Sequence, residues 1–139
     1  MAEKEISYRQ GNNLDLATVI ELYRASTLGE RRPVDDPERM AAMLQNANLV
    51  ITAWHGNLLV GISRALTDFV YTTYLSDLAV HANYQHQGIG KELIRRTKAA
   101  TDPRASLTLL AAPAAEKYYP HIGFQHMPQC WRIPAGENI

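Results

Sequence analysis

In the stretch DLAVHANYQHQGIGKELI, Asp77–Ile94, an apolar run gives way to a polar loop with two glycines and then to a charged, periodic segment. Gly88 and Gly90 lie at the predicted junction between a buried strand and a helix. The first N–H groups of a helix have no partner inside it, and the helix dipole adds partial positive charge there. Glycines allow a phosphate to approach these groups without a Cβ in the way. The junction predicts a phosphate or pyrophosphate site, with a tight strand-to-helix connection as the alternative.

Two other phosphate-binding motifs do not fit this loop. A P-loop would need a glycine where Gln85 stands and a serine or threonine where Glu92 stands. A dinucleotide fingerprint would need a third glycine at the position of Leu93. Both readings are therefore set aside.

Length, charge and cysteine usage bound the class of protein. The 139 residues predict one domain, residues 1–139, and the net charge of zero gives no general reason to expect nucleic acid or an anionic membrane as partner. A single cysteine, Cys130, rules out an internal disulfide, and the five histidines show no spacing typical of metal ligands. The N-terminal residues lack the apolar core of a signal peptide, so we expect a cytoplasmic protein without membrane association and without a metal.

The periodicity of the chain predicts the element order β-α-α-β-β-β-α-β-α-β-β, which is a mixed α/β sheet. Asn13 is the expected cap of the first helix, and Asp36 with Pro37 marks the start of the second. Alternation in the third central strand predicts that Leu75, Asp77 and Ala79 share one face. The strands are expected at 5–10, 48–54, 58–66, 70–80, 106–112 and, once or twice, within 123–134; the helices at 12–26, 37–46, 88–101 and 113–122.

Two separated motifs resemble those of the GNAT acetyltransferase superfamily. The run from Gln85 to Gly90 is similar to its motif A, Gln/Arg-x-x-Gly-x-Gly/Ala, and the stretch AAPAAEKYYPHIGF is similar to its motif B. In motif B the matching residues are Ala115, the pair Tyr118-Tyr119 and Gly123-Phe124. The resemblance implies the GNAT fold, in which the central parallel strands splay apart.

The resemblance also implies acetyl-CoA as the cofactor and an amine as the acetyl acceptor. Backbone groups of Leu78, Ala79 and Val80 would pair with the pantetheine arm as an added strand would. The amides of the following loop would hold the pyrophosphate at a helix N-terminus; the loop residues are Gln85, His86, Gln87, Gly88, Ile89, Gly90 and Lys91.

Acetyl transfer needs an acid, an oxyanion donor and a free amine. Tyr119 matches the tyrosine that acts as general acid in many GNAT members, and the Val80 amide matches the usual oxyanion donor. An alkyl amine with a pKa near ~10.4 must also lose a proton before it attacks. Asp77 and Glu30 are the candidate bases. The alternatives are a ring that only fills space for Tyr119, a structural hydrogen-bond acceptor for Asp77, and a solvated loop side chain for Glu30.

The predicted function is transfer of an acetyl group from acetyl-CoA to a primary amine of a small molecule or peptide, by direct attack in a ternary complex. The first alternative is a non-catalytic acyl-CoA-binding or sensing module on the same fold. A nucleic-acid-binding domain is the second alternative, which the neutral charge disfavours. Strand edges expected near the C-terminus favour a homodimer.

Overall fold

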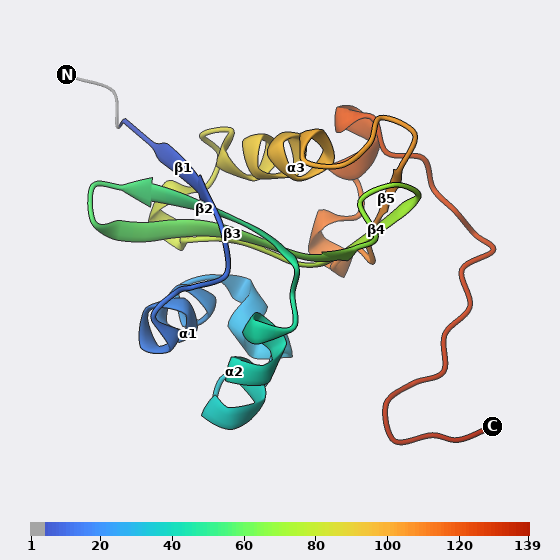
Figure 1. Ribbon diagram of the computed structural model, residues 1–139, viewed down its shortest axis with the longest axis horizontal. Coiled ribbons are helices and arrows are strands. Elements are labelled where there is room, and N and C mark those ends of the chain that lie inside the picture. Colours follow the sequence, from blue (N-terminus) through green and yellow to red (C-terminus); the bar gives the residue numbers. More distant parts are fainter. Residues whose placement is uncertain (1–4) are drawn as a thin grey trace.

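The computed structural model describes residues 5–139; the first four residues of the predicted domain lie outside this range. Within it, one mixed sheet has the order β1-β2-β3-β4-β5 (Figure 1). Neighbouring strands are antiparallel except for β4 and β5, which are parallel. The strands are β1 (Ser7–Gln10), β2 (Leu49–His55), β3 (Leu58–Thr67), β4 (Thr72–Val80) and β5 (Ser106–Thr108). The mixed α/β class predicted from the sequence is confirmed.

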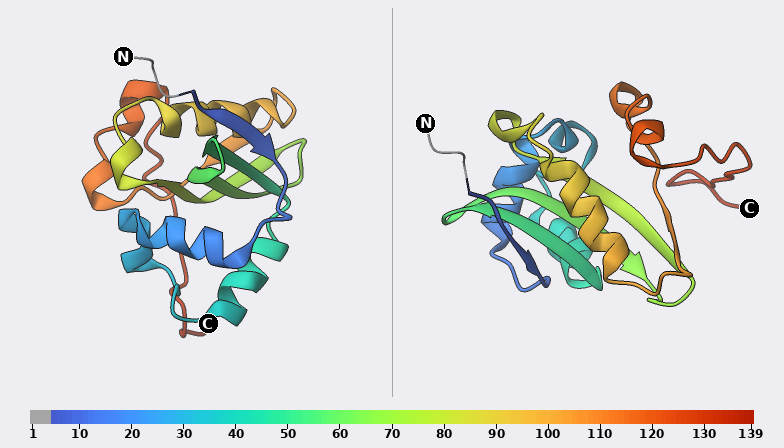
Figure 2. Two further views of the ribbon diagram at one scale, coloured as in Figure 1. Left: turned by 90° about the vertical axis from the view of Figure 1, so that its left-hand side faces the viewer. Right: turned by 90° about the horizontal axis from the view of Figure 1, so that it is seen from above.

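Helices cover both faces of the sheet. Figure 2 shows α1 (Leu16–Arg24) and α2 (Pro37–Gln45) on one face and α3 (Ile89–Ala99) on the other. The core is correspondingly divided into two apolar clusters, one under each helical layer. In the described part of the chain, residues 5–139, four short 3₁₀ segments are also present: η1 (Thr27–Arg31), η2 (Ala82–Tyr84), η3 (Pro113–Ala115) and η4 (Tyr119–Ile122). No helix in residues 5–139 combines the length and apolar character needed to cross a bilayer.

The helix starts follow their caps. Asp36 caps α2 and Pro37 is its first residue, as predicted. The cap predicted for α1 is wrong, because Asp15, not Asn13, accepts from the backbone N–H of Thr18 at 3.0 Å. A carboxylate at the N-cap accepts a hydrogen bond from a first-turn N–H that has no partner within the helix. Its negative charge also interacts favourably with the positive end of the helix dipole. On α3 the buried residues Ile89, Leu93 and Thr97 recur every four positions, as expected for one face of a helix.

The parallel pair separates almost at once. β5 pairs with β4 only at Thr72, Thr73 and Tyr74, and β4 then continues to Val80 without β5 beside it. Opposite Arg64 and Ala65 of β3, the register of β4 skips Ser76, which is a β-bulge. A bulge bends its strand and increases the local twist. The predicted splaying of the central parallel strands is therefore confirmed.

The bulge also corrects the predicted faces of β4. Leu75 belongs to the apolar cluster under α3, whereas Ala79 belongs to the cluster under α1 and α2. Simple alternation had placed both on one side with Asp77. The extra residue, Ser76, shifts the period by one, so that Leu75 lies on the same side as Leu78 and Val80.

The C-terminal part departs most from the prediction. Residues 113–122 form η3 and η4 instead of an α-helix, and residues 5–139 contain no strand after Thr108. Figure 1 shows the last residues running alongside the body as an extended tail, and Trp131 within it is 93% exposed. Pro120 interrupts the helical stretch, and Pro128 and Pro134 remove N–H donors that strand pairing would need. The predicted helix at 113–122 and the final strands are wrong.

Candidate active site

A cleft of about 640 Å³ opens where β5 leaves β4. We call it the β4–β5 cleft. One wall is the C-terminal half of β4, the second is the chain of residues 109–122, and η1 and the N-terminus of α3 close its ends. Its volume lies within the range of ~300–1,000 Å³ common for small-molecule sites. The sheet topology thus creates a site at the point where two parallel strands part, as ligand sites in α/β sheets commonly do.

The exposed edge of β4 lines this cleft. Leu78, Ala79 and Val80 all contribute to the wall, and β3 occupies the other edge of the strand. The Gln85 side chain donates from Nε2 to the carbonyl of Val80 at 3.1 Å, which ties the loop to the end of the strand. An unpaired strand edge can bind an extended ligand by main-chain hydrogen bonds. The pairing with pantetheine proposed for these three residues stays a prediction.

The glycine loop begins α3 with an unusual backbone. His86 has φ +64° and Gly88, the N-cap residue, has φ +83°. The Glu92 amide makes the first helical hydrogen bond, to the Gly88 carbonyl, so the amides before it have no partner inside the helix. A Cβ on Gly88 would meet nothing within 4 Å, and one on Gly90 would point toward Val80 and Leu78 in the cleft wall. The loop residues at the start of α3 thus line the cleft with backbone N–H groups that no helical hydrogen bond uses.

Most of the predicted cofactor residues are brought together here. Lining the cleft are Gln85, His86, Gly88, Ile89, Gly90 and Lys91, whereas Gln87 does not line it. The combination of an N-cap glycine, a helix dipole and the Lys91 charge suits an anion.

Tyr119 lies in the second wall, at the start of η4. Its ring packs edge-to-face against Tyr118 and Phe124, with centroids 5.5 and 5.3 Å apart. Burial, and next Tyr118, raise the pKa of Tyr119 above its ordinary value, while Arg31 partly offsets the rise. Tyr118 also lines the cleft. The phenol of Tyr119 is thus a protonated donor in the cleft at neutral pH, which suits the acid role predicted for it.

Asp77 lies behind β4 and not in the cleft. Its carboxylate is completely buried and accepts from Nε of Arg32 and Nε of Arg64, each at 2.6 Å. The hydroxyl of Tyr23 in α1 donates to it at the same distance of 2.6 Å. The second nitrogens of the two guanidiniums bind Ser76, at its carbonyl and its hydroxyl, both at 2.9 Å. The bulged residue and the carboxylate are therefore held by one network, the Asp77 network (Tyr23, Arg32, Arg64, Ser76 and Asp77).

The network makes Asp77 a poor base. Burial alone would raise the pKa of Asp77, but hydrogen bonds and ion pairs led by Arg64 lower it below its usual value. A carboxylate whose charge is stabilised by two guanidiniums has little tendency to take a proton. The geometry favours the structural role of Asp77 over its predicted role as base.

Glu30 is also outside the cleft. It lies in η1 and is exposed, whereas its neighbours Arg31 and Arg32 line the cleft. The base role predicted for Glu30 has no support in this arrangement.

Arg32 and Arg64, which bind Asp77, could not be chosen from the sequence, because nothing in an isolated arginine indicates a buried partner far along the chain. Within residues 5–139 no three His, Cys, Asp or Glu side chains gather closely enough to hold a metal ion.

Comparison with known proteins places the chain in a family. A sequence model described as an acetyltransferase (GNAT) domain matches residues 9–130. The chain is 30% identical over 112 residues to a protein named histone acetyltransferase TAP1 from Glycine max, an alignment that covers 71% of this chain and 47% of TAP1. The chain belongs to the GNAT acetyltransferase family.

Solved structures share the fold over nearly the whole chain. A GNAT family acetyltransferase, SP0256 from Streptococcus pneumoniae, has a TM-score of 0.77 at 23% identity, covering 94% of this chain and 96% of that one. The aminoglycoside N-acetyltransferase AAC(6')-Iy, solved in complex with CoA, has a TM-score of 0.74 at 17% identity, covering 96% of both chains. The chain spans about half the length of the curated relatives it matches, 47% of TAP1 and 54% of TAP2 of Glycine max.

Proposed function

We propose that this protein transfers the acetyl group of acetyl-CoA to a primary amine. The observation that carries the proposal is the convergence of three features on the β4–β5 cleft: an unpaired strand edge, an anion-binding loop and the phenol of Tyr119. Family membership and the CoA complex of a protein with the same fold support the same conclusion.

The residues present fit the cofactor. The loop amides, with Lys91, would hold its pyrophosphate, and the edge of Leu78–Val80 would hold its pantetheine arm. Acetyl-CoA supplies the activated thioester. The Val80 amide would donate to the oxyanion, and Tyr119 would donate to the sulfur as it leaves.

No carboxylate lines the cleft in the described part of the chain. The proposed reaction therefore uses no carboxylate base, and the amine loses its proton by way of water or binds as the free base. At neutral pH a free base is a small fraction of an alkyl amine, so we expect the rate to rise with pH up to the pKa of the bound acceptor.

Replacing Gly90 with glutamate is expected to abolish acetyl-CoA binding. The added carboxylate would extend from a Cβ that faces Val80 and Leu78, into the region where the pyrophosphate would lie. Ligand binding stabilises a folded protein by an amount that grows with the logarithm of ligand concentration above Kd, so wild type should show a rise in melting temperature with acetyl-CoA and the variant should show none. The readout is thermal shift together with calorimetric titration.

Gly90→Ala and Gly90→Gln are the matched controls. Gly90 has no positive φ, and a Cβ there makes contacts of 3.8 and 4.0 Å, so alanine should fold and retain binding. Glutamine carries the bulk of glutamate without its charge and separates the two effects. Wild-type affinity in the glutamate variant would show that the loop does not bind the pyrophosphate.

Measuring the release of CoA in the presence of a panel of amines distinguishes an acetyltransferase from a non-catalytic acyl-CoA-binding module. The panel should contain lysine peptides, arylalkylamines, amino sugars, amino acids and polyamines, with thiol release and product mass as readouts. Binding of acetyl-CoA without acetylation of any amine would favour the acyl-CoA sensor. A homodimer and a cytoplasmic location stay predictions, and light scattering of the purified chain tests the first.

A further inference from the structure

The β4–β5 cleft has a one-sided charge distribution. Its lining includes the cationic side chains Arg31, Arg32 and Lys91, and among the described lining residues there is neither aspartate nor glutamate. A polycationic acceptor, such as a polyamine or an amino sugar with several ammonium groups, would enter without a counter-charge. The charges of the cleft therefore select against that class of amine.

The nearby buried carboxylate does not change this balance. Asp77 carries one negative charge and is bound by two positive guanidiniums, Arg32 and Arg64, so these three groups sum to one positive charge. The Asp77 side chain is completely buried, and its oxygens already accept from Tyr23, Arg32 and Arg64. It has no capacity to bind the ammonium group of a substrate.

Arg31 differs from its neighbour in having no anionic partner. Arg32 donates to Asp77 and to two carbonyls, whereas within residues 5–139 the guanidinium of Arg31 forms no ion pair and no side-chain hydrogen bond. Both residues belong to the connection that follows α1, and η1 packs against β4. Arg31 is therefore a cation that lines the cleft and is available to a ligand.

Arg31 lies in η1, which packs against β4, and it lines the same cleft as Tyr119, so we assign it to the acceptor side and not to the cofactor phosphates. It lies near enough to Tyr119 to lower the pKa of that phenol, which faces the reacting sulfur in the proposed function. The phosphate loop has its own cation, Lys91, at the N-terminus of α3. Two positive groups thus serve separate parts of one cleft.

We propose that the acceptor is an amine that also carries an anionic group, a carboxylate or a phosphate, which pairs with Arg31. This inference rests on the proposed acetyltransferase function and narrows its substrate class. The planar guanidinium binds carboxylates and phosphates through two parallel hydrogen bonds, which gives direction as well as attraction. Free amino acids and short aminoalkyl phosphates have this chemistry, whereas polyamines do not.

The test compares acceptors of one skeleton that differ only in the anion. The pairs are tyrosine with tyramine, lysine with cadaverine, and O-phosphoethanolamine with ethanolamine; the last pair distinguishes phosphate from carboxylate. The measured quantity is kcat/KM for thiol release from acetyl-CoA, expressed per free-base amine so that the different amine pKa values do not bias the comparison. The variants are Arg31→Gln and Arg31→Glu.

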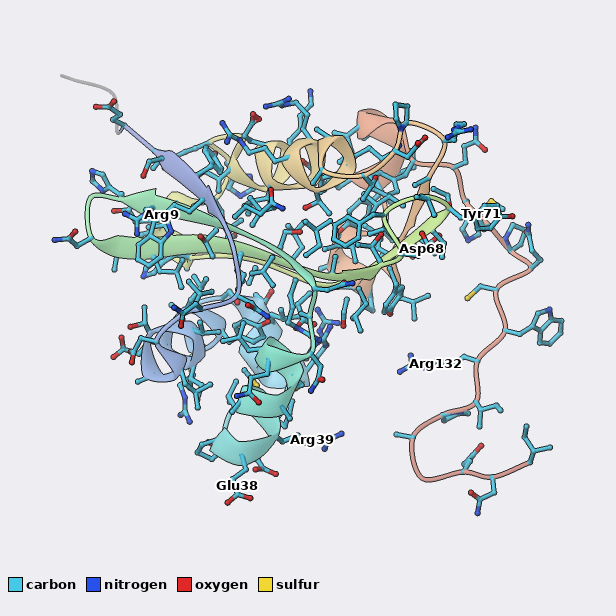
Figure 3. All side chains as sticks on the ribbon, in the orientation of Figure 1. Arg9, Glu38, Arg39, Asp68, Tyr71 and Arg132 are labelled. Atoms are coloured by element: carbon cyan, nitrogen blue, oxygen red, sulfur yellow. The ribbon has the colours of Figure 1, made fainter. Side chains whose placement is uncertain are left out.

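Arg39→Glu is the control for net charge. Arg39 is an exposed residue of α2, projects away from the sheet (Figure 3) and does not line the cleft. The Arg39→Glu substitution changes the total charge of the protein by the same amount as Arg31→Glu.

In wild type we expect the anionic member of at least one pair to be preferred by about 10-fold to 100-fold, the range of charge-assisted bidentate hydrogen bonds. The preference should fall to about one in Arg31→Gln, reverse in Arg31→Glu, and persist in Arg39→Glu.

Three results would overturn the inference. A wild-type preference for tyramine and cadaverine would do so, as would an anion preference that survives both Arg31 variants. A loss of acetyl-CoA affinity in Arg31→Gln that disappears with dephospho-CoA would assign Arg31 to the 3′-phosphate instead. In each of these cases the amine is still acetylated and the proposed function stands. Absence of turnover with every amine, by contrast, would overturn the proposed function and this inference with it.

Discussion

Asp77→Asn is expected to lower the free energy of unfolding by about 3–5 kcal/mol, because removal of one partner leaves buried charges without compensation. Two guanidiniums, Arg32 and Arg64, each donate to this carboxylate at 2.6 Å, and the Asp77 side chain is completely buried. A domain is stable by only ~5–15 kcal/mol, so the loss is a large share of the total. The melting temperature should fall by roughly 10–20 °C for a chain of this size.

Asp35→Asn is the matched control. Asp35 also pairs with an arginine, Arg24, at 2.8 Å, but its side chain is 91% exposed. Exposed ion pairs contribute ~0–1 kcal/mol, so this variant should unfold near the wild-type temperature. Equal effects of the two substitutions, measured by urea or thermal unfolding, would show that the Asp77 network does not stabilise the fold.

At acid pH, wild type and Asp77→Asn should differ less in their free energy of unfolding than at neutral pH. The pKa of Asp77 is lowered in the folded state, so in acid the unfolded chain binds more protons and stability rises with pH. The contribution of this carboxylate to the free energy of unfolding is fully present at pH values above its pKa in the unfolded chain, near ~3.9. It is lost as the pH falls through the lower pKa of the folded state. Unfolding of both proteins between about pH 6 and pH 2 measures this convergence.

The sequence predicts the cofactor side of the cleft well because its signals are local. Gly88 and Gly90 lie at a junction whose chemistry needs only a strand, a helix and the residues between them, and α3 begins at Ile89, one residue after the predicted start. The apolar period of α3 and the cap at Asp36 are equally local. Such features depend on contacts between residues a few positions apart, which a single sequence displays directly.

The acceptor side of the cleft is harder to predict from the sequence, because it depends on contacts between residues far apart in the chain. Asp77 binds Tyr23 and Arg32, which are 54 and 45 positions away in the chain, so its structural role depends on the packing of α1 and η1 against the sheet. The bulge at Ser76 interrupts the strict alternation from which the faces of β4 were inferred. The C-terminal strands failed for a related reason: an alternating pattern forms a strand only when a neighbour is available to pair with it.

Tyr119 is limited as an acid by the same burial that positions it. Burial, with Tyr118 as the next cause, raises its pKa above the ordinary phenol value of ~10. A phenol with a raised pKa gives up its proton less readily than an ordinary phenol, which disfavours complete proton transfer to the leaving thiolate. We expect the phenol to stabilise the developing thiolate mainly by donating a hydrogen bond, so that its effect lies toward the lower end of the usual range for an acid.

Tyr119→Phe is accordingly expected to lower kcat about 10²-fold, the lower limit typical of general acid catalysis, which corresponds to about 2.7 kcal/mol of barrier. The ring remains, so its contacts with Tyr118 and Phe124 and the affinity for acetyl-CoA should stay near wild type. Single-turnover acetylation of a responsive amine and thermal unfolding measure the two effects separately. Tyr118→Phe is the control, because Tyr118 also lines the cleft but is 41% exposed. A loss confined to Tyr118→Phe would give that residue the role, and less than about a threefold change in both variants would leave water as the donor to the leaving sulfur.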